Sequence, residues 1–105
     1  MIHSDGANRV RELVSRSGLI IPYTVGTFLS MDGSRVIKVG RRGVADTLAC
    51  IDGRFVAIEI KTTDTDRQSA DQKKFQKILE DNGGTYIIAD FRKGQDGLEA
   101  VRHAF

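Results

Sequence analysis

The 105-residue sequence has little of what marks secreted or membrane proteins. Its single cysteine, Cys50, excludes an intramolecular disulfide. No apolar run approaches the length of a membrane span, and the polar segment from Met1 to Gly18 lacks the apolar core of a signal peptide. We therefore expect a cytoplasmic protein with no membrane partner.

Several common catalytic arrangements are also missing. The sequence contains no Gly-rich phosphate loop, no Ser-His-Asp order and no internal repeat. His3 and His103 have no second His or Cys at metal-ligand spacing, so we interpret both as surface residues. With 40% hydrophobic residues the chain can hold one core, which predicts a single domain over residues 1–105.

The most informative segment contains an Asp-Gly pair at residues 52–53, which lies between two apolar runs rich in β-formers. A two-residue loop of this type predicts a β-hairpin and fixes its register. Counting outward from the loop places Asp46 directly opposite Glu59. Because side chains alternate along a strand, Lys61 shares the face of both acids.

Two carboxylates on directly opposed positions repel each other unless a cation lies between them. Their Cβ atoms would be roughly 4.5–5.5 Å apart, which lets both carboxylates reach one divalent ion. We therefore interpret Asp46 and Glu59 as candidate metal ligands. A solvated strand face with a surface ion pair, worth roughly 0–1 kcal/mol, is an equally good interpretation of the residues alone.

A basic cluster without acidic residues leads into Asp46 and comprises Arg35, Lys38, Arg41 and Arg42. The formal net charge of +2 is too small to indicate nucleic acid by itself. Basic side chains beside a carboxylate site would suit a phosphodiester substrate, since phosphate contacts supply most non-specific affinity. We favour this interpretation over a solvated loop because of where the cluster lies.

The N-terminal third of the sequence predicts a helix followed by strands. An apolar stripe through residues 7–17 predicts a helix that ends at Gly18 and places Glu12 on its opposite face. Residues 19–30 and 35–39 are β-like, with Pro22 favouring an edge strand and a turn at Asp32-Gly33. We expect these two segments to form the first hairpin of the sheet.

The C-terminal half predicts a helix over residues 69–81, closed by Asn82-Gly83-Gly84, with a buried stripe of Phe75, Ile78 and Leu79. Residues 85–90 predict a strand beside residues 55–61, and the helix between the two strands implies a right-handed parallel crossover. A short helix is expected between residues 96 and 104.

Gln72 has two interpretations. The run Ser69-Ala70-Asp71-Gln72 fits a capping box, in which the glutamine side chain bonds back to the N-cap amide. Gln72 also extends the apolar stripe toward the strand that carries Lys61, where its amide could orient a water or a phosphate oxygen. Spacing alone favours the cap. Lys73 similarly fits a solvated helix face better than a DNA contact.

Taken together, Asp46, a turn, Glu59-Ile60-Lys61 and a helix with Gln72 resemble the PD-(D/E)XK nuclease superfamily. The segments GRRGVAD, GRFVAIEIK and DQKKFQKILEDNGGTYIIA look like its VRR-NUC branch, the virus-type replication-repair nucleases. The resemblance is strong over roughly residues 40–89 and looser over the N-terminal helix. It implies an α/β fold, in which helices flank a mixed β-sheet with an α-β-β-β-α-β core.

The resemblance also implies roles for individual residues. Asp46 and Glu59 would bind Mg²⁺ or Mn²⁺, with the Ile60 carbonyl as a further ligand. Lys61 would be the catalytic lysine, and Gln72 would be the helix glutamine that approaches the site.

The sequence departs from the family pattern in two places. Ala45 stands where the superfamily name has proline, and the first-helix glutamate has no clear counterpart. Asp5 and Glu12 are the only candidates for that glutamate.

The implied function is a metal-dependent DNA endonuclease of phage or bacterial type, acting on branched DNA such as four-way (Holliday) junctions. Small stand-alone members of this family look like homodimers, with the N-terminal helix or residues 19–39 as candidate contacts here. The DNA contacts would be Arg35, Lys38, Arg41, Arg42 and Lys73. The alternatives are a non-catalytic nucleic-acid-binding module of the same fold, a nuclease acting on flaps or single strands, and a restriction-type nuclease.

Overall fold

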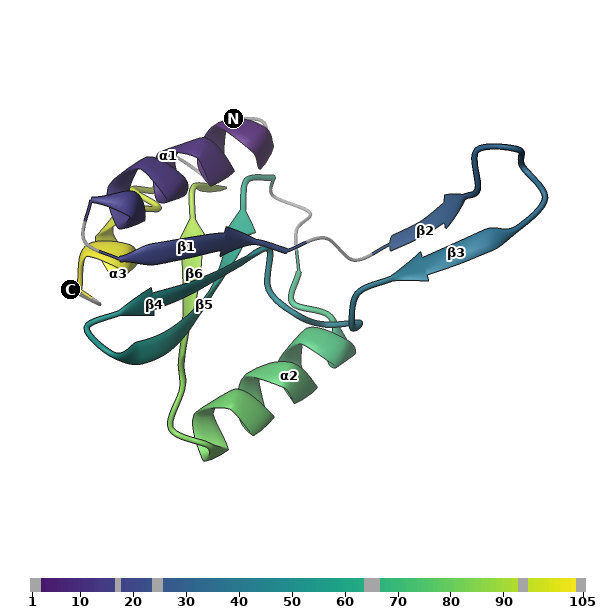
Figure 1. Ribbon diagram of the computed structural model, residues 1–105. Helices are drawn as coiled ribbons and strands as arrows, with labels where there is room; N and C mark the ends of the chain where they lie inside the picture. Colours follow the sequence, from purple (N-terminus) through teal and green to yellow (C-terminus); the bar gives the residue numbers. More distant parts are fainter. Residues whose placement is uncertain (1–2, 17, 24–25, 64–66, 93–94, 104–105) are drawn as a thin grey trace.

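A four-stranded mixed sheet organises the computed structural model, which describes residues 3–16, 18–23, 26–63, 67–92 and 95–103 (Figure 1). The elements in chain order are α1 (His3–Ser15), β1 (Leu19–Pro22), β2 (Gly26–Leu29), β3 (Val36–Val39), β4 (Thr47–Ile51), β5 (Arg54–Lys61), α2 (Ala70–Asp81), β6 (Thr85–Asp90) and α3 (Glu99–Arg102). The sheet has the strand order β1-β4-β5-β6, so the expected mixed sheet with flanking helices is confirmed.

The predicted hairpin is formed by β4 and β5. Asp52 and Gly53 both adopt positive φ values, of 51° and 75°, as the two-residue loop requires. The strands pair Ile51 with Arg54 and Cys50 with Phe55, which is the predicted register. After α2 the chain returns in β6, which pairs with β5 in parallel as the crossover argument predicts.

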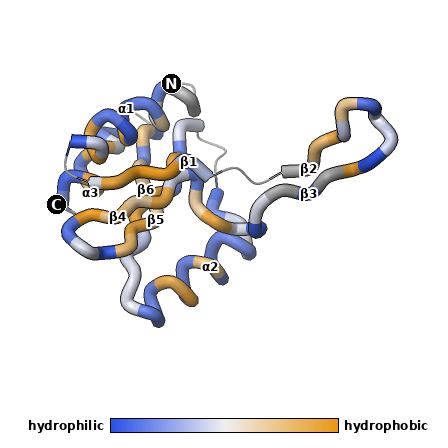
Figure 2. The backbone as a smooth tube through the Cα atoms, in the orientation of Figure 1, coloured by the Kyte–Doolittle hydropathy of each residue, from blue (hydrophilic) through white to orange (hydrophobic). Residues whose placement is uncertain are grey.

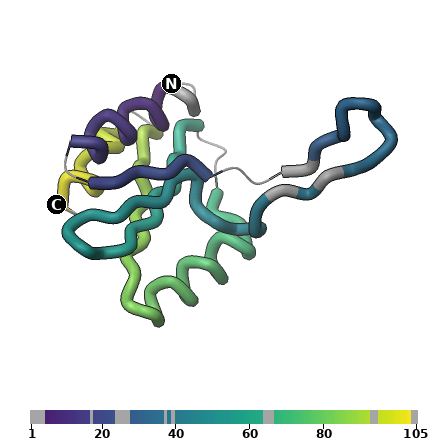
Figure 3. Tube along the Cα trace, viewed as in Figure 1, coloured from purple at the N-terminus to yellow at the C-terminus, as the bar shows by residue number. Residues whose placement is uncertain are grey.

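The prediction that residues 19–39 form the first hairpin of the sheet is wrong. Only β1 joins the sheet, where it pairs antiparallel with β4 at the edge. β2 and β3 pair with each other in a separate two-stranded sheet that extends away from the body (Figures 1 and 3). The predicted turn itself is present: Gly33 adopts a φ of 74°, and the Asp32 carboxylate accepts hydrogen bonds from Ser30 Oγ and Ser34 N at 2.7 and 3.0 Å. This turn pairs β2 with β3 but does not join the hairpin to the main sheet.

The hydrophobic core lies on one face of the sheet, beneath α1 and α3, which are distant in sequence but lie side by side (Figures 1 and 3). Its fully buried side chains include Val10 and Val14 of α1, Ile58 of β5 and Val101 of α3. Figure 2 shows how hydrophobic the central strands are. The predicted stripe of the first helix is therefore confirmed as far as Val14, whereas its last position, Ser17, lies outside the described residues and the helix ends at Ser15. The C-terminal helix is a packing element.

Helix α2 lies on the opposite face and packs mainly against β6, where the rings of Phe75 and Tyr86 meet edge to face at 6.3 Å. The prediction of a buried apolar stripe in α2 is wrong, because no α2 residue is buried and Ile78 is 40% exposed. The helix covers only part of this face. Both of its predicted ends are confirmed, with Ser69 as N-cap and Asn82 as C-cap. No helix among the described residues is long and apolar enough to cross a membrane.

Candidate active site

Asp46 and Glu59 meet at the point where the β4–β5 ladder ends. Asp46 precedes β4, and the pairing of Thr47 with Ile58 continues the register that sets Asp46 opposite Glu59. The Asp46 N–H donates to Glu59 Oε2 at 3.2 Å, and the Ile60 N–H donates to Asp46 Oδ2 at 3.0 Å. Each acid is thus fixed by the backbone of the other strand.

Lys61 and Glu59 are both buried, each with 5% of its surface exposed. Lys61 Nζ lies 3.8 Å from Glu59 Oε1, and it donates to the Arg67 carbonyl at 3.1 Å and to Gln72 Oε1 at 3.4 Å. Burying charged groups costs several kcal/mol per ion unless partners compensate for the lost water. This lysine is therefore held in a defined position by an acid, an amide and a main-chain carbonyl.

Gln72 forms the predicted capping box and also reaches one of the two acids. Its Oε1 accepts from the Ser69 N–H at 2.8 Å, and Ser69 Oγ accepts from the Gln72 N–H at 3.1 Å, which completes the capping box. The remaining amide group, Nε2, donates to Glu59 Oε1 at 2.9 Å. The capping box therefore holds the Gln72 side chain in place, and the Nε2 group that the cap leaves free donates to the buried Glu59.

The electrostatics of the pair are unfavourable without a further cation. Burial, followed by the negative charge of Asp46, raises the pKa of Glu59 from 4.5 to about 7, although Lys61 acts in the opposite direction. One lysine thus does not balance two acids in this position. A second positive charge placed between the carboxylates would relieve the repulsion.

The acids face a cleft of about 360 Å³. Its lining comprises Tyr23, Arg42, Gly43, Val44, Asp46, Glu59, Ser69, Asp71 and Gln72. It therefore lies between the segment before β4 and the first turn of α2.

A solved structure described as a VRR_NUC domain matches this chain with a TM-score of 0.65. The match covers 98% of this chain and 97% of that chain, at 15% sequence identity. This chain has the fold of a VRR_NUC domain. No family sequence model and no curated protein sequence matches it. The likeness to the VRR_NUC domain is therefore one of fold.

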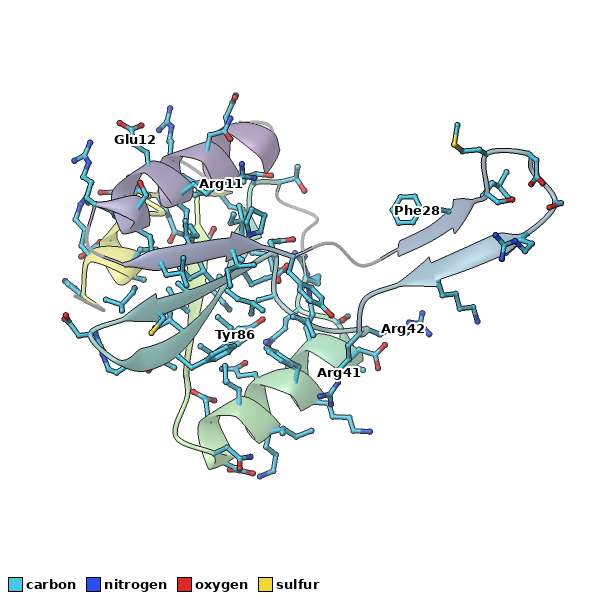
Figure 4. All side chains as sticks on the ribbon, in the orientation of Figure 1. Arg11, Glu12, Phe28, Arg41, Arg42 and Tyr86 are labelled. Atoms are coloured by element: carbon cyan, nitrogen blue, oxygen red, sulfur yellow. The ribbon has the colours of Figure 1, made fainter. Side chains whose placement is uncertain are left out.

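The VRR_NUC-type fold brings only part of the predicted basic cluster to the cleft. Arg42 lines it and lies 3.7 Å from Asp71 Oδ2, and the Arg41 N–H donates to Tyr23 Oη at 2.9 Å (Figure 4). Arg35 and Lys38 are exposed on the β2–β3 hairpin, away from the carboxylates, and Lys73 is exposed on α2.

Neither candidate for the first-helix glutamate lines the cleft. Glu12 pairs with Arg16 at 3.2 Å and points away from the body (Figure 4), and Asp5 is exposed on the same helix. Helix α1 covers the face of the sheet opposite the carboxylates, so this VRR_NUC-type fold keeps both residues out of the site.

Sequence reasoning missed two residues that shape the cleft. The Tyr23 N–H donates to the Asp46 carbonyl at 2.9 Å, which ties the end of β1 to the site. Gly43 has a φ of 84°, and a Cβ there would collide with the main-chain carbonyl of Asp71. Only glycine permits this close approach. Neither residue could have been found from the sequence, since both contacts join segments far apart in the chain.

The donor set of this site fits a hard divalent cation. Among the described residues no group of three or more His, Cys, Asp or Glu side chains comes together, which leaves the Asp46–Glu59 pair. Mg²⁺ is usually held by one or two carboxylates, with water and substrate phosphate completing its shell. The Ile60 carbonyl also faces the strand of Asp46, because a residue in a ladder directs its N–H and C=O to the same neighbour.

Proposed function

We propose that this protein is a Mg²⁺- or Mn²⁺-dependent DNA endonuclease that hydrolyses phosphodiester bonds. The observation that carries the proposal is a linked group of side chains, in which the partly exposed Asp46 and Gln72 and the buried Glu59 line an open cleft. The buried Lys61 contacts Glu59 and Gln72 behind it. Such a cluster is costly to bury and contributes little to a stable core, so it has to be explained by its chemistry.

The chain's own residues would have distinct parts in the reaction. Asp46 and Glu59 would hold the cation, and the Ile60 carbonyl would assist them. When bound, a divalent ion lowers the pKa of a water molecule and neutralises charge on the scissile phosphate. Lys61, held near Glu59 and Gln72, would donate from Nζ to the phosphate oxygen on which charge develops.

Gln72 would act as a positioning residue. Its Nε2 donates to Glu59 Oε1 at 2.9 Å, which leaves Glu59 Oε2 on the side of Asp46. Because the capping box fixes the amide, the carboxylate keeps this orientation without any movement of α2.

DNA would reach the cleft along its basic border. Arg42 lines the cleft and Arg41 adjoins it, whereas Arg35 and Lys38 extend the positive charge along the hairpin. The substrate we propose is branched DNA such as a four-way junction, and the assembly is a homodimer whose two sites would make two symmetric cuts.

A non-catalytic DNA-binding module of the same fold is the second candidate. Such a module would need the basic border but not a buried lysine beside two opposed acids. Retention of Glu59 and Lys61, each with 5% of its surface exposed, favours the nuclease.

Cleavage of linear duplex, flap and four-way junction DNA tests the proposal, with and without Mg²⁺ or Mn²⁺. We expect metal-dependent cutting that is fastest on the junction and that is lost in the Glu59→Gln variant. Glu80→Gln, on an exposed position of α2, is the matched control and should cut normally. DNA binding without cleavage in either metal would support the non-catalytic module instead. Faster cutting of flaps or single strands than of the junction would show that these are the substrate.

A further inference from the structure

Tyr23, which follows directly after β1, is held at both ends by the segment that leads into β4. Its N–H donates to the Asp46 carbonyl at 2.9 Å, and its Oη accepts from the Arg41 N–H at 2.9 Å. The side chain therefore spans residues 41–46, and most of this segment lines the carboxylate cleft. Because main-chain atoms at both ends of the segment hold Tyr23, the phenol oxygen has a fixed place at the cleft.

The hydroxyl of Tyr23 keeps a donor that its own fold does not use. A phenol can both accept and donate a hydrogen bond, and the bond from Arg41 uses only its capacity to accept. Among the described residues, no acceptor binds the hydroxyl proton. Tyr23 lines the cleft and is only partly buried, so this donor is open to a ligand there. Accepting a hydrogen bond also strengthens a hydroxyl as a donor, because linked hydrogen bonds polarise one another.

We propose that the Tyr23 hydroxyl donates to an oxygen of the phosphate next to the scissile one, which makes Tyr23 a substrate-binding residue. Its place decides which phosphate it meets. The phenol oxygen lies at the Arg41 end of the segment, whereas the acids that would hold the cation lie at the Asp46 end. The scissile phosphate belongs to the acids and Lys61, so the hydroxyl is left for the adjoining one. The inference rests on the proposed function and adds a contact to it.

A phosphate oxygen suits this donor better than a base edge does. A hydrogen bond to a charged oxygen is roughly twice as strong as one between neutral groups. Arg42 lines the same cleft, so an anion there is also favoured by a nearby positive charge. Most hydrogen bonds between proteins and DNA go to phosphate and sugar. Stacking of the Tyr23 ring on an unpaired base is the alternative.

Tyr23→Phe tests the contact, because it removes the hydroxyl and keeps the ring. We expect binding of a four-way junction, measured on filters in Ca²⁺, to weaken by roughly 10-fold. The slope of binding against salt concentration should stay unchanged, since a neutral donor releases no counterion. Tyr86→Phe is the matched control and should bind as the wild type does. It deletes the hydroxyl of the chain's other tyrosine, which packs on Phe75 and is not among the described residues that line the cleft.

Two results with these variants would overturn the inference. Tyr23→Phe that binds the junction as tightly as the wild type would show that the hydroxyl makes no contact. If Tyr23→Leu then bound weakly, the ring would be assigned to base stacking instead. Urea unfolding checks that Tyr23→Phe remains folded. We expect it to do so, because Arg41 is exposed and water can replace the hydroxyl as the acceptor of its N–H.

Substituted DNA separates a direct contact from a merely structural role of Tyr23. One phosphate at a time would be replaced with a methylphosphonate, which exchanges a charged oxygen for a methyl group. We expect one substitution beside the cleavage position to weaken binding of the wild type but to weaken Tyr23→Phe much less, because the variant has already lost that contact. A structural role would make the two losses add at every phosphate, and that result would overturn the inference.

The binding readouts also separate the Tyr23 contact from the nuclease activity. A wild-type chain that binds DNA but does not cut it in Mg²⁺ or Mn²⁺ would refute the proposed function, whereas non-additive losses at one phosphate would still support the contact. A wild-type chain that cuts DNA but shows additive losses at every phosphate would refute the contact alone. A chain that binds no DNA would overturn both.

Discussion

The pH dependence of stability in the Glu59→Gln variant offers the sharpest test of the acid pair. Burial and the charge of Asp46 raise the pKa of Glu59 from 4.5 to about 7. Below pH 4.5 the side chain is protonated in both the folded and unfolded states. Between pH 4.5 and about 7 the unfolded chain has released a proton that the folded chain still holds. The free energy of unfolding therefore falls as the pH rises through this window.

The size of the effect follows from the shift. One pKa unit corresponds to about 1.4 kcal/mol, so ionised Glu59 should cost the metal-free protein about 3 kcal/mol above pH 7. Glutamine removes this titration and keeps a side-chain oxygen for the Asp46 N–H, but its amide nitrogen then faces the Gln72 Nε2 donor, which costs part of the gain. Lys61 loses a carboxylate 3.8 Å away, which offsets part of the gain. At pH 8 we expect the variant to be as stable as the wild type or more stable, by up to about 2 kcal/mol.

Urea unfolding followed by circular dichroism at pH 5, 6, 7 and 8, with a chelator present, measures both profiles. The wild-type free energy of unfolding should fall by about 2 to 3 kcal/mol more than that of the variant between pH 5 and 8, because part of the titration of the unfolded chain lies below pH 5. Glu80→Gln, on an exposed position, should follow the wild type. Parallel profiles for the wild type and the Glu59 variant would contradict a raised pKa of Glu59, because they would show that the carboxylate ionises as freely when folded as when unfolded.

Further variants test the other parts of the site. Lys61→Ala should reduce cleavage by on the order of 10²-fold or more without abolishing DNA binding, because the lysine would act on charge that develops in the transition state; a variant within a few-fold of wild-type rate in a single-turnover assay would exclude that role. Replacing Arg41 and Arg42 with Ala should flatten the salt dependence of DNA binding by up to about 0.9 in slope per lost phosphate contact, and an unchanged slope in filter-binding titrations would assign the pair to a solvated loop. Gly43→Ala should lower stability by at least about 2 kcal/mol and displace the first turn of α2, because the residue needs a positive φ and approaches the Asp71 carbonyl. Gly33 has a φ of 74° and open space around it, so Gly33→Ala should cost only about 1 kcal/mol. Urea unfolding of both variants measures the two losses, and equal losses would contradict the packing argument.

Calcium gives a test that needs no variant. Its larger and more flexible coordination shell should support DNA binding better than cleavage. Comparable cleavage rates in Ca²⁺ and Mg²⁺ would contradict the proposed geometry.

The parts of the fold that depend on neighbouring residues could be predicted from the sequence alone. The Asp52-Gly53 loop fixes the β4–β5 register because two residues with positive φ allow only one way for the strands to pair, and that register sets Asp46 opposite Glu59. The ends of α2 follow from its local capping residues. Hydrophobic periodicity likewise predicted the buried stripe of α1.

The tertiary structure decided what depends on segments that are distant in the chain. The sequence shows that residues 19–39 favour strands, but pairing between β2 and β3 and pairing of either with β1 satisfy the same hydrogen bonds. Only the assembled fold shows that β2 and β3 leave the sheet. In the same way, the sequence gives no sign that Gly43 must meet Asp71, or that Gln72 can cap α2 and reach Glu59 together. These outcomes depend on how α2 packs beside the β4–β5 ladder, and no local preference encodes that placement.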